Sequence, residues 1–211
     1  MTRRRIGFLG FDDVQALDLF GPADAFASDA LRGDPHNLPY EVLIFGLGSR
    51  HFRTSAGTRI AADAATPTTL ALDTLVIPGG AGLREPGVAE RAAEWIRGCA
   101  PHVRRIASVC TGIYGLAATG LLDGRRATTH WAAARDVAQR FPRIQLDSDA
   151  LFVKDGRFYT SAGISAGIDL ALAMIEEDLG LEAARGVAEE MVVHFKRPGG
   201  QHQFHANQRT A

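Results

Sequence analysis

Cys110 lies where a short apolar segment meets a run of small residues, and this position could give its thiol a chemical role. Residues 105–109 have the Ile and Val content of a buried strand, and residues 111–119 are typical of a helix that packs closely on a sheet. A strand that turns directly into a helix holds the joining side chain in a pocket, an arrangement known as a nucleophile elbow. Unpaired N–H groups at the helix start favour a thiolate, so we expect an acidic Cys110. The alternative is a buried cysteine that acts as a small hydrophobic side chain.

A carboxylate and an imidazole lie near the ends of other predicted strands. Asp18 stands between two leucines in the connection after the first strand, where it could face the pocket or cap the next turn. His130 lies at another strand-to-helix junction, where it could contact a ligand or be satisfied by backbone groups. The residues alone leave both alternatives open at each position.

Gly79 and Gly80 follow the predicted strand at residues 74–77, at the strand end where open α/β sheets bind ligands. The spacing of glycines in PGGAG fits neither a dinucleotide fingerprint nor a phosphate-binding loop with its lysine, so we expect no nucleotide cofactor. The backbone N–H groups of these glycines could form an oxyanion pocket opposite Cys110. An ordinary tight turn is the alternative.

Strands and helices alternate along the chain and would bring these residues to one edge of a sheet. We expect single strands at residues 5–10, 40–47, 74–77 and 105–109, with hairpins at 53–62 and 151–160. We expect helices at residues 22–30, 88–100, 111–119, 132–141 and 182–195, with a long helix that stops at Gly180. This order predicts an α/β fold with a doubly wound, mainly parallel sheet flanked by helices.

The composition indicates a folded protein with one core. The chain has 211 residues, of which 46% are hydrophobic and 22% are charged. A formal net charge of −1 gives no general attraction to nucleic acid or to an anionic membrane. Cys99 and Cys110 are too few for a disulfide framework and have no zinc-type spacing, which predicts a reducing cytoplasm and no metal. No apolar segment is long enough to span a bilayer.

The C-terminal residues differ in composition from the rest of the chain. The stretch KRPGGQHQFHANQRTA is polar, rich in Gly and Gln, and without periodicity. We therefore expect one domain at residues 1–196 and a linker or tail at residues 197–211.

Five motifs occur in order along the chain: FDDVQALDLFGPADAF, LVIPGGAG, SVCTGIYGLAATGLLDGRRATTHW, YTSAGISAGIDLALAMIEEDLG and HFKRPGGQHQF. Together they resemble the ThiJ/PfpI superfamily, which has a flavodoxin-like fold of the class I glutamine amidotransferase type. Within it, the chain is most similar to the N-terminal domain of GlxA-type AraC-family transcriptional regulators. That resemblance implies a homodimer, a small-molecule effector and no cofactor. It also implies that DNA is bound only through a C-terminal helix-turn-helix domain, which we expect to be absent from this chain.

Two departures separate the sequence from neighbouring enzymes. Thr111 follows Cys110, where the hydrolases of the intracellular-protease type have a histidine. His194 is followed by Phe195, so the late His-x-Glu of the amidotransferases is missing. Neither catalytic triad is therefore assembled.

Isonitrile hydratase is a third enzyme class that the sequence resembles, and that resemblance implies catalytic roles for Cys110, Thr111 and Asp18. A thiolate would add to the isonitrile carbon while the carboxyl group supplies a proton and then directs water. We expect first a ligand-sensing domain whose pocket contains Cys110, Gly79, Gly80 and His130, and second an isonitrile hydratase. A redox or carbonyl-stress protein ranks third, because Asp18 replaces the glutamate of that group.

Overall fold

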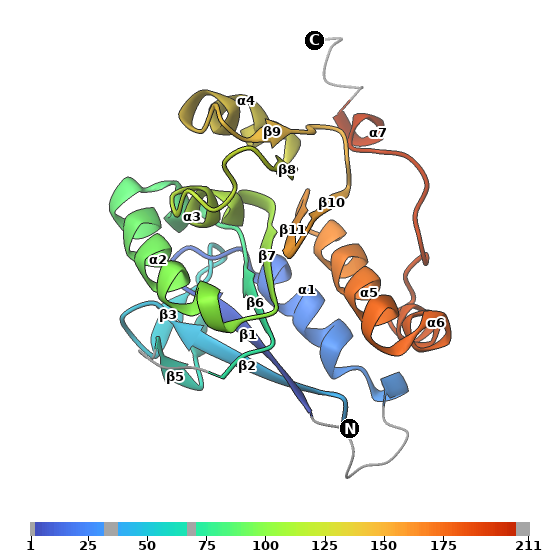
Figure 1. Ribbon diagram of the computed structural model, residues 1–211. Helices are drawn as coiled ribbons and strands as arrows, with labels where there is room; N and C mark the ends of the chain where they lie inside the picture. Colours follow the sequence, from blue (N-terminus) through green and yellow to red (C-terminus); the bar gives the residue numbers. More distant parts are fainter. Residues whose placement is uncertain (1–2, 32–37, 67–70, 206–211) are drawn as a thin grey trace.

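A seven-stranded sheet forms the centre of the computed structural model, which describes residues 3–31, 38–66 and 71–205 (Figure 1). In spatial order the strands are β10 (Phe152–Asp155), β11 (Phe158–Ser161), β7 (Arg105–Val109), β6 (Thr74–Ile77), β1 (Arg4–Gly10), β2 (Tyr40–Gly46) and β5 (Ala64–Ala65). Every neighbouring pair is parallel except the β10–β11 hairpin at one edge. The expected mainly parallel α/β sheet is therefore confirmed.

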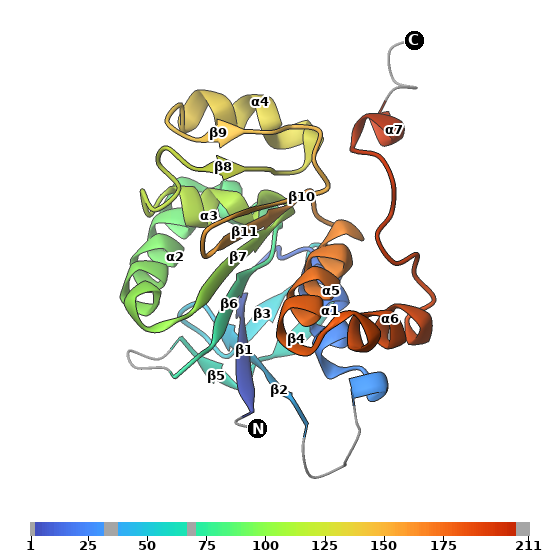
Figure 2. The same cartoon turned by 45° about the vertical axis from the view of Figure 1, so that its right-hand side comes forward.

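Helices cover both faces of this sheet (Figure 2). On one face lie α1 (Ala16–Ala27), α5 (Ala166–Leu179) and α6 (Leu181–Glu190), and on the other lie α2 (Pro86–Cys99) and α3 (Ile113–Ala117). Because both faces are covered, β6 and β7 are buried along their whole length, which explains why most of their residues are apolar.

Smaller elements lie outside the two helical layers. Beyond the carboxyl ends of the strands are β8 (Arg126–Ala127), β9 (Gln145–Leu146), α4 (Trp131–Arg140) and α7 (His202–His205) (Figure 1). The predicted hairpin around Gly57 is formed by β3 (His51–Arg53) and β4 (Arg59–Ala61).

The first helix differs from the prediction. It begins at Ala16 rather than at Pro22, so Asp18 lies in its first turn and Pro22 lies in its interior. A proline inside a helix costs about 3 kcal/mol. Leu19 and Phe26 are buried on the sheet side of this helix, and burial of such side chains contributes roughly 1.5–3 kcal/mol each, which offsets that cost.

The C-terminal part also differs from the prediction. The helix α6 ends at Glu190 instead of Phe195, and Val192 and Lys196 adopt positive φ angles of 55°. These left-handed residues turn the chain away from the helix axis. Residues 197–203, which we expected in a linker or tail, are packed against the domain, whereas residues 206–211 lie outside the described part of the chain. The division into residues 1–196 and 197–211 stays a prediction.

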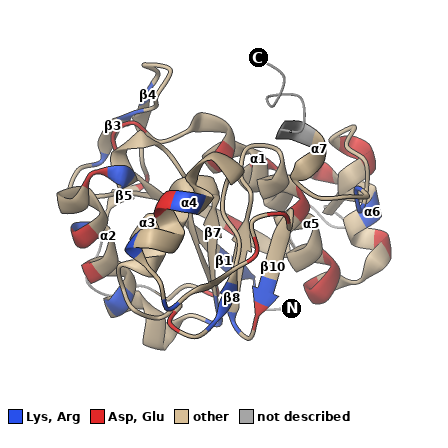
Figure 3. Cartoon of the chain, turned by 90° about the horizontal axis from the view of Figure 1, so that it is seen from above, with Lys and Arg blue, Asp and Glu red and all other residues tan. Residues whose placement is uncertain are grey.

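Charges of both signs are mixed on the surface helices. Figure 3 shows basic and acidic residues together on α2, α4 and α6, in keeping with the net charge of −1. Across the described residues, the helices are too short or too polar to cross a lipid bilayer.

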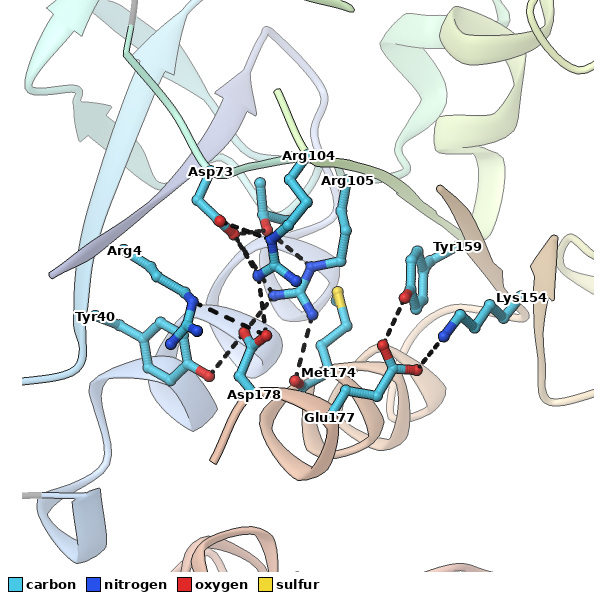
Figure 4. A network of polar contacts seen from close by, with 11 residues as sticks. Arg4, Tyr40, Asp73, Arg104, Arg105, Lys154, Tyr159, Met174, Glu177 and Asp178 are labelled. Atoms are coloured by element: carbon cyan, nitrogen blue, oxygen red, sulfur yellow. Dashed lines mark hydrogen bonds and ion pairs between the residues drawn. The ribbon is translucent and has the colours of Figure 1, made fainter. Parts of the chain in front are cut away.

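A buried arginine joins helix α5 to the amino ends of the central strands (Figure 4). The side chain of Arg105 is 2% exposed and donates to Asp178 Oδ2 at 2.6 Å and to Thr74 Oγ1 at 3.1 Å. Asp178 also accepts hydrogen bonds from Tyr40 at 3.1 Å and Arg104 at 2.9 Å. Because a buried cation needs a paired anion, this network fixes the last turn of α5 on the sheet.

We predict that Asp178→Asn destabilises the protein by roughly 3 kcal/mol, because it leaves the buried Arg105 cation without its nearest anion. Urea denaturation measures the change in unfolding free energy. The matched control is Glu182→Gln, which breaks an exposed ion pair with Arg185 and should cost less than about 1 kcal/mol. A loss for Asp178→Asn no larger than that of the control would contradict a structural role for the network.

Candidate functional site

Cys110 occupies the predicted strand-to-helix turn. It follows β7 directly, adopts a positive φ of 56°, and begins a short 3₁₀ turn that leads into α3. Gly112 allows this turn to approach β6, because a Cβ atom at Gly112 would lie 2.1 Å from the carbonyl oxygen of Ile77. The small residues after Cys110 therefore meet the steric condition of an elbow, and the side chain itself is 8% exposed.

Asp18 faces Cys110 and does not cap its helix. Its carboxylate is fully buried and accepts hydrogen bonds from the Gly79 N–H group at 3.1 Å and the Ile164 N–H group at 2.6 Å. The Cys110 thiol lies next to this carboxylate, close enough for each group to shift the pKa of the other. The cap position of the helix is taken by Gln15, so the pocket alternative for Asp18 is the one that the structure shows.

The two ionisable groups perturb each other. Burial raises the pKa of Asp18 from 3.8 to about 6, against the opposing effect of its hydrogen bonds. Burial also raises the pKa of the Cys110 thiol, and the negative charge of Asp18 raises it further. The Thr111 N–H group lowers the pKa of Cys110 as expected, but it is outweighed. The expectation of an acidic thiol is therefore wrong: at neutral pH the pair holds one proton, on sulfur.

Thr111 and the two glycines fix the elbow to the loop after β6. The Thr111 hydroxyl accepts from the Gly80 N–H group at 2.8 Å and donates to the Gly80 carbonyl at 3.1 Å. Gly79 must lack a side chain, because a Cβ atom there would lie 2.5 Å from Asp18 Oδ2 and 2.8 Å from Cys110 Cβ.

The N–H groups of both glycines are thus already occupied by side chains, that of Gly79 by Asp18 and that of Gly80 by Thr111. Neither N–H group is therefore free to form the oxyanion pocket that was one of the two alternatives for these glycines. Their role in the structure is to hold the side chains of Asp18 and Thr111.

Three further residues complete the surroundings of the pair, and sequence reasoning missed them. Gly163 has a φ of 91°, and a Cβ atom there would lie 2.0 Å from Cys110 Cβ. Ile164 supplies the N–H group that binds Asp18, and Thr129 donates through Oγ1 to the Cys110 carbonyl at 2.8 Å. The small residues of SAGISAG after a predicted strand were the available signal, because they resemble the run that follows Cys110.

A cavity of about 180 Å³ is lined in part by Gly163, the residue that packs against Cys110. Its lining residues are His130, Trp131, Leu151, Ala162, Gly163, Ile164, Ser165, Ala166, Arg197 and Gln201. The Nδ1 of His130 accepts from the Ala132 N–H group at 3.3 Å, and its ring lines the cavity, so its contact with a ligand stays a prediction. Burial lowers the pKa of His130, so the imidazole is neutral at pH 7.

Metal ligation has no support in the described ranges, where no three His, Cys, Asp or Glu side chains are grouped so that they could hold an ion. The site itself contains a thiol, a carboxyl group of raised pKa and surrounding backbone N–H groups.

The sheet order and the elbow define an α/β protein of the class I glutamine amidotransferase type. A family model described as the DJ-1/PfpI family matches residues 4–177, and the chain belongs to that family. Isonitrile hydratase from Pseudomonas putida is 37% identical over 181 residues, which are 86% of this chain and 75% of that enzyme. The regulator GbdR from Pseudomonas aeruginosa is 30% identical over 94% of this chain, which spans only 53% of the regulator's length.

Solved structures agree with the fold. A ThiJ/PfpI family protein from Pseudomonas syringae matches with a TM-score of 0.75 at 27% identity, over 94% of this chain and 78% of that protein. DJ-1beta from Drosophila melanogaster matches with a TM-score of 0.77 at 21% identity, over 92% of this chain and the whole of that protein. These matches confirm the fold class predicted from the sequence.

We predict that Asp18→Asn speeds alkylation of Cys110 by iodoacetamide at pH 8 on the order of tenfold, because loss of the neighbouring negative charge lowers the pKa of the thiol. Peptide mapping by mass spectrometry measures the rate, and Cys99 in the same molecule is the internal reference. Burial raises the pKa of Cys99 to about 11, and its rate should not change. An unchanged or slower Cys110 would show that the charge of Asp18 does not govern the thiol.

We predict that Gly163→Ala destabilises the protein by roughly 2–4 kcal/mol, because it adds a clash with Cys110 to the strain of a positive φ. Gly57→Ala is the matched control, since Gly57 has a φ of 85° and open space around it. That control should cost only about 1–2 kcal/mol. Thermal and urea unfolding of both variants give the comparison, and equal losses would argue against close contact at Cys110.

Proposed function

We propose that this chain is a cysteine-dependent enzyme that hydrates isonitriles to N-substituted formamides. The observation that carries the proposal is the buried pair of Asp18 and Cys110, which lie close enough to shift each other's pKa, with a pKa of about 6 for the carboxyl group. The similarity to isonitrile hydratase from Pseudomonas putida, over 86% of the chain, supports the same activity. We therefore favour the isonitrile hydratase hypothesis over the sensor-domain hypothesis that the sequence motifs favoured.

The first step uses the single proton that the pair holds. The S–H bond of Cys110 breaks as the sulfur forms a bond to the terminal carbon of the isonitrile, and Asp18 takes the thiol proton and passes it to that carbon. The product is a thioimidate, in which sulfur, one hydrogen and a C=N bond share the carbon. Asp18 is left as a carboxylate, and the backbone N–H groups of Gly79 and Ile164 stabilise its charge.

The second step adds water to the thioimidate. Asp18 takes a proton from a water molecule as the water oxygen bonds to the carbon, and passes that proton to the nitrogen. The C–S bond then breaks as the oxygen forms the carbonyl group, and the hydroxyl proton returns to the pair. The sum is one isonitrile and one water converted to one formamide, with the thiol regenerated.

This chemistry explains how the site can work without a histidine or a catalytic triad. The same carboxyl group carries the thiol proton to the isonitrile carbon and later takes a proton from water, and both transfers require a pKa near neutrality. Burial of Asp18 provides that shift, and the N–H groups around it keep the pKa from rising further. Thr111 holds the elbow against Gly80 and so orients the sulfur.

A ligand-sensing domain is the second candidate function. The similarity to GbdR covers 94% of this chain, and the cavity beside Gly163 would admit a small effector. In that case binding should raise the melting temperature with ligand concentration and leave the solution unchanged. A homodimer and DNA binding through a further helix-turn-helix domain belong to this candidate and stay predictions.

We predict that the chain converts cyclohexyl isocyanide to N-cyclohexylformamide, measured by liquid chromatography. Cys110→Ala should abolish turnover because the covalent step is lost, and Asp18→Asn should reduce kcat by on the order of 10²–10⁴ because the acid and base are lost. Cys99→Ala is the matched control and should keep full activity. Formamide production that survives Cys110→Ala would refute the proposal, and a melting-temperature shift without turnover would favour the sensor.

The pH dependence follows from the same pair. The reactive form holds one proton, and the form with two protons dominates below the Asp18 pKa of about 6. We therefore predict that kcat/KM falls tenfold per pH unit as the pH drops below about 6, and is level from about 7 to 9. A profile that rises towards acid pH would contradict the assignment of Asp18.

A further inference from the structure

The residues after α6 run along the molecule towards α4 and β8 (Figure 1). Two of them, Arg197 and Gln201, line the cavity. Arg197 makes the first contact, at the start of α5. Its guanidinium group donates to the two carboxylate oxygens of Asp169, at 3.0 and 2.5 Å, and to Ser165 Oγ at 3.3 Å. This paired geometry is charge-assisted and directional, so it fixes the loop between β11 and α5.

Gln201 makes the second contact, at the loop between β8 and α4. Its side chain is 2% exposed, and its Nε2 donates to the Thr129 and Ala150 carbonyls at 3.0 Å and to Thr128 Oγ1 at 3.3 Å. Its Oε1 accepts from the Trp131 N–H group at 2.8 Å. A buried amide with this many partners is a strong structural tie, because leaving any of these groups unpaired would be costly.

The two loops that this segment joins are the loops that enclose the reactive pair. The β11–α5 loop places Gly163 against Cys110 and directs the Ile164 N–H group at Asp18. The β8–α4 loop places the Thr129 hydroxyl on the Cys110 carbonyl. The cavity lies between these loops, and Arg197 and Gln201 form part of its wall.

We propose that residues 197–201 are a clasp that holds these two loops at a fixed separation, and that Arg197 and Gln201 thereby set the size of the substituent that can reach Cys110. They are positioning residues, since they act on the pair through Ser165, Ile164 and Thr129. That the clasp selects substrates rests on the proposed function. That the clasp controls access to the thiol does not depend on it.

The composition of the cavity wall indicates which substituents the closed site would accept. Trp131, Leu151 and Ile164 are apolar, and the charge of Arg197 is balanced by Asp169. A volume of about 180 Å³ suits a substituent of the size of a small ring. The clasp therefore selects compact, uncharged and mainly apolar substituents, because a charged group would be desolvated there without a partner.

The test compares Arg197→Met with Arg185→Met, in which an exposed arginine with a single ion-pair partner is changed in the same way. Cys110 is modified with methyl and with benzyl methanethiosulfonate, and Cys99 serves as the internal standard. Loss of the charge-assisted contacts should raise the rate of Cys110 with the benzyl reagent on the order of tenfold and change the methyl rate less. Arg185→Met should leave both rates unchanged.

A second pair of variants keeps the test decisive if Arg197→Met fails to fold. Asp169→Asn breaks the same ion pair from the other side, and Gln201→Ala releases the second contact. Either variant, folded by circular dichroism, should raise the benzyl rate. Unchanged rates in all folded clasp variants would overturn the proposal.

Substrate selection gives an independent measurement. The ratio of kcat/KM for methyl isocyanide to that for cyclohexyl isocyanide should change at least severalfold in the clasp variants and not in Arg185→Met. If the unchanged protein hydrates no isonitrile, the proposed function is wrong. The thiol-modification rates still test whether the clasp controls access to Cys110. If it hydrates both substrates and the ratio is the same in every variant, the clasp does not select substrates.

Discussion

The buried carboxylate of Asp18 is the constraint on which the functional site depends. It lies in the first turn of α1, yet it accepts from the N–H group of Gly79 after β6 and from the N–H group of Ile164 after β11, and it lies next to the thiol of Cys110 after β7. A fully buried carboxylate is stable only with such donors. Four separate segments must therefore meet around one side chain, and this requirement explains why glycines stand wherever two of the segments approach closely.

The strand β7 and the helix α5 fix the positions of the residues around Asp18. Arg105 at the amino end of the strand holds Asp178 in the last turn of the helix, and Cys110 follows the other end of the strand. The loop that precedes α5 binds Asp18, and Arg197 binds Asp169 in the first turn of α5. Both ends of the helix are thus tied by charged groups, so the position of Gly163 over the thiol is set by the fold and not by the loop alone.

Local sequence patterns were sufficient to predict the fold. Alternating buried strands and helices predicted the parallel sheet, and the small residues after Cys110 predicted the elbow. The predicted start of α1 was wrong because proline usually occurs in the first turn of a helix, and Pro22 was placed there. The burial of apolar side chains of this helix, which offsets the cost of an interior proline, is not visible in the local sequence. The acidity of Cys110 was misjudged for a similar reason. A helix terminus is visible in a sequence, whereas desolvation and the charge of a distant Asp18 are not.

The contacts that complete the site come from far along the chain, and no local signal reports them. Ile164 binds Asp18 across 146 residues, and Gln201 binds Thr129 across 72. For chain synthesis this separation means that Cys110 leaves the ribosome before Gly163 and Ile164, the residues that cover it and bind its partner. At about 5–20 residues per second, the thiol lacks this cover for several seconds during synthesis. Oxidants and trapping reagents therefore have their best access to this cysteine in the nascent chain.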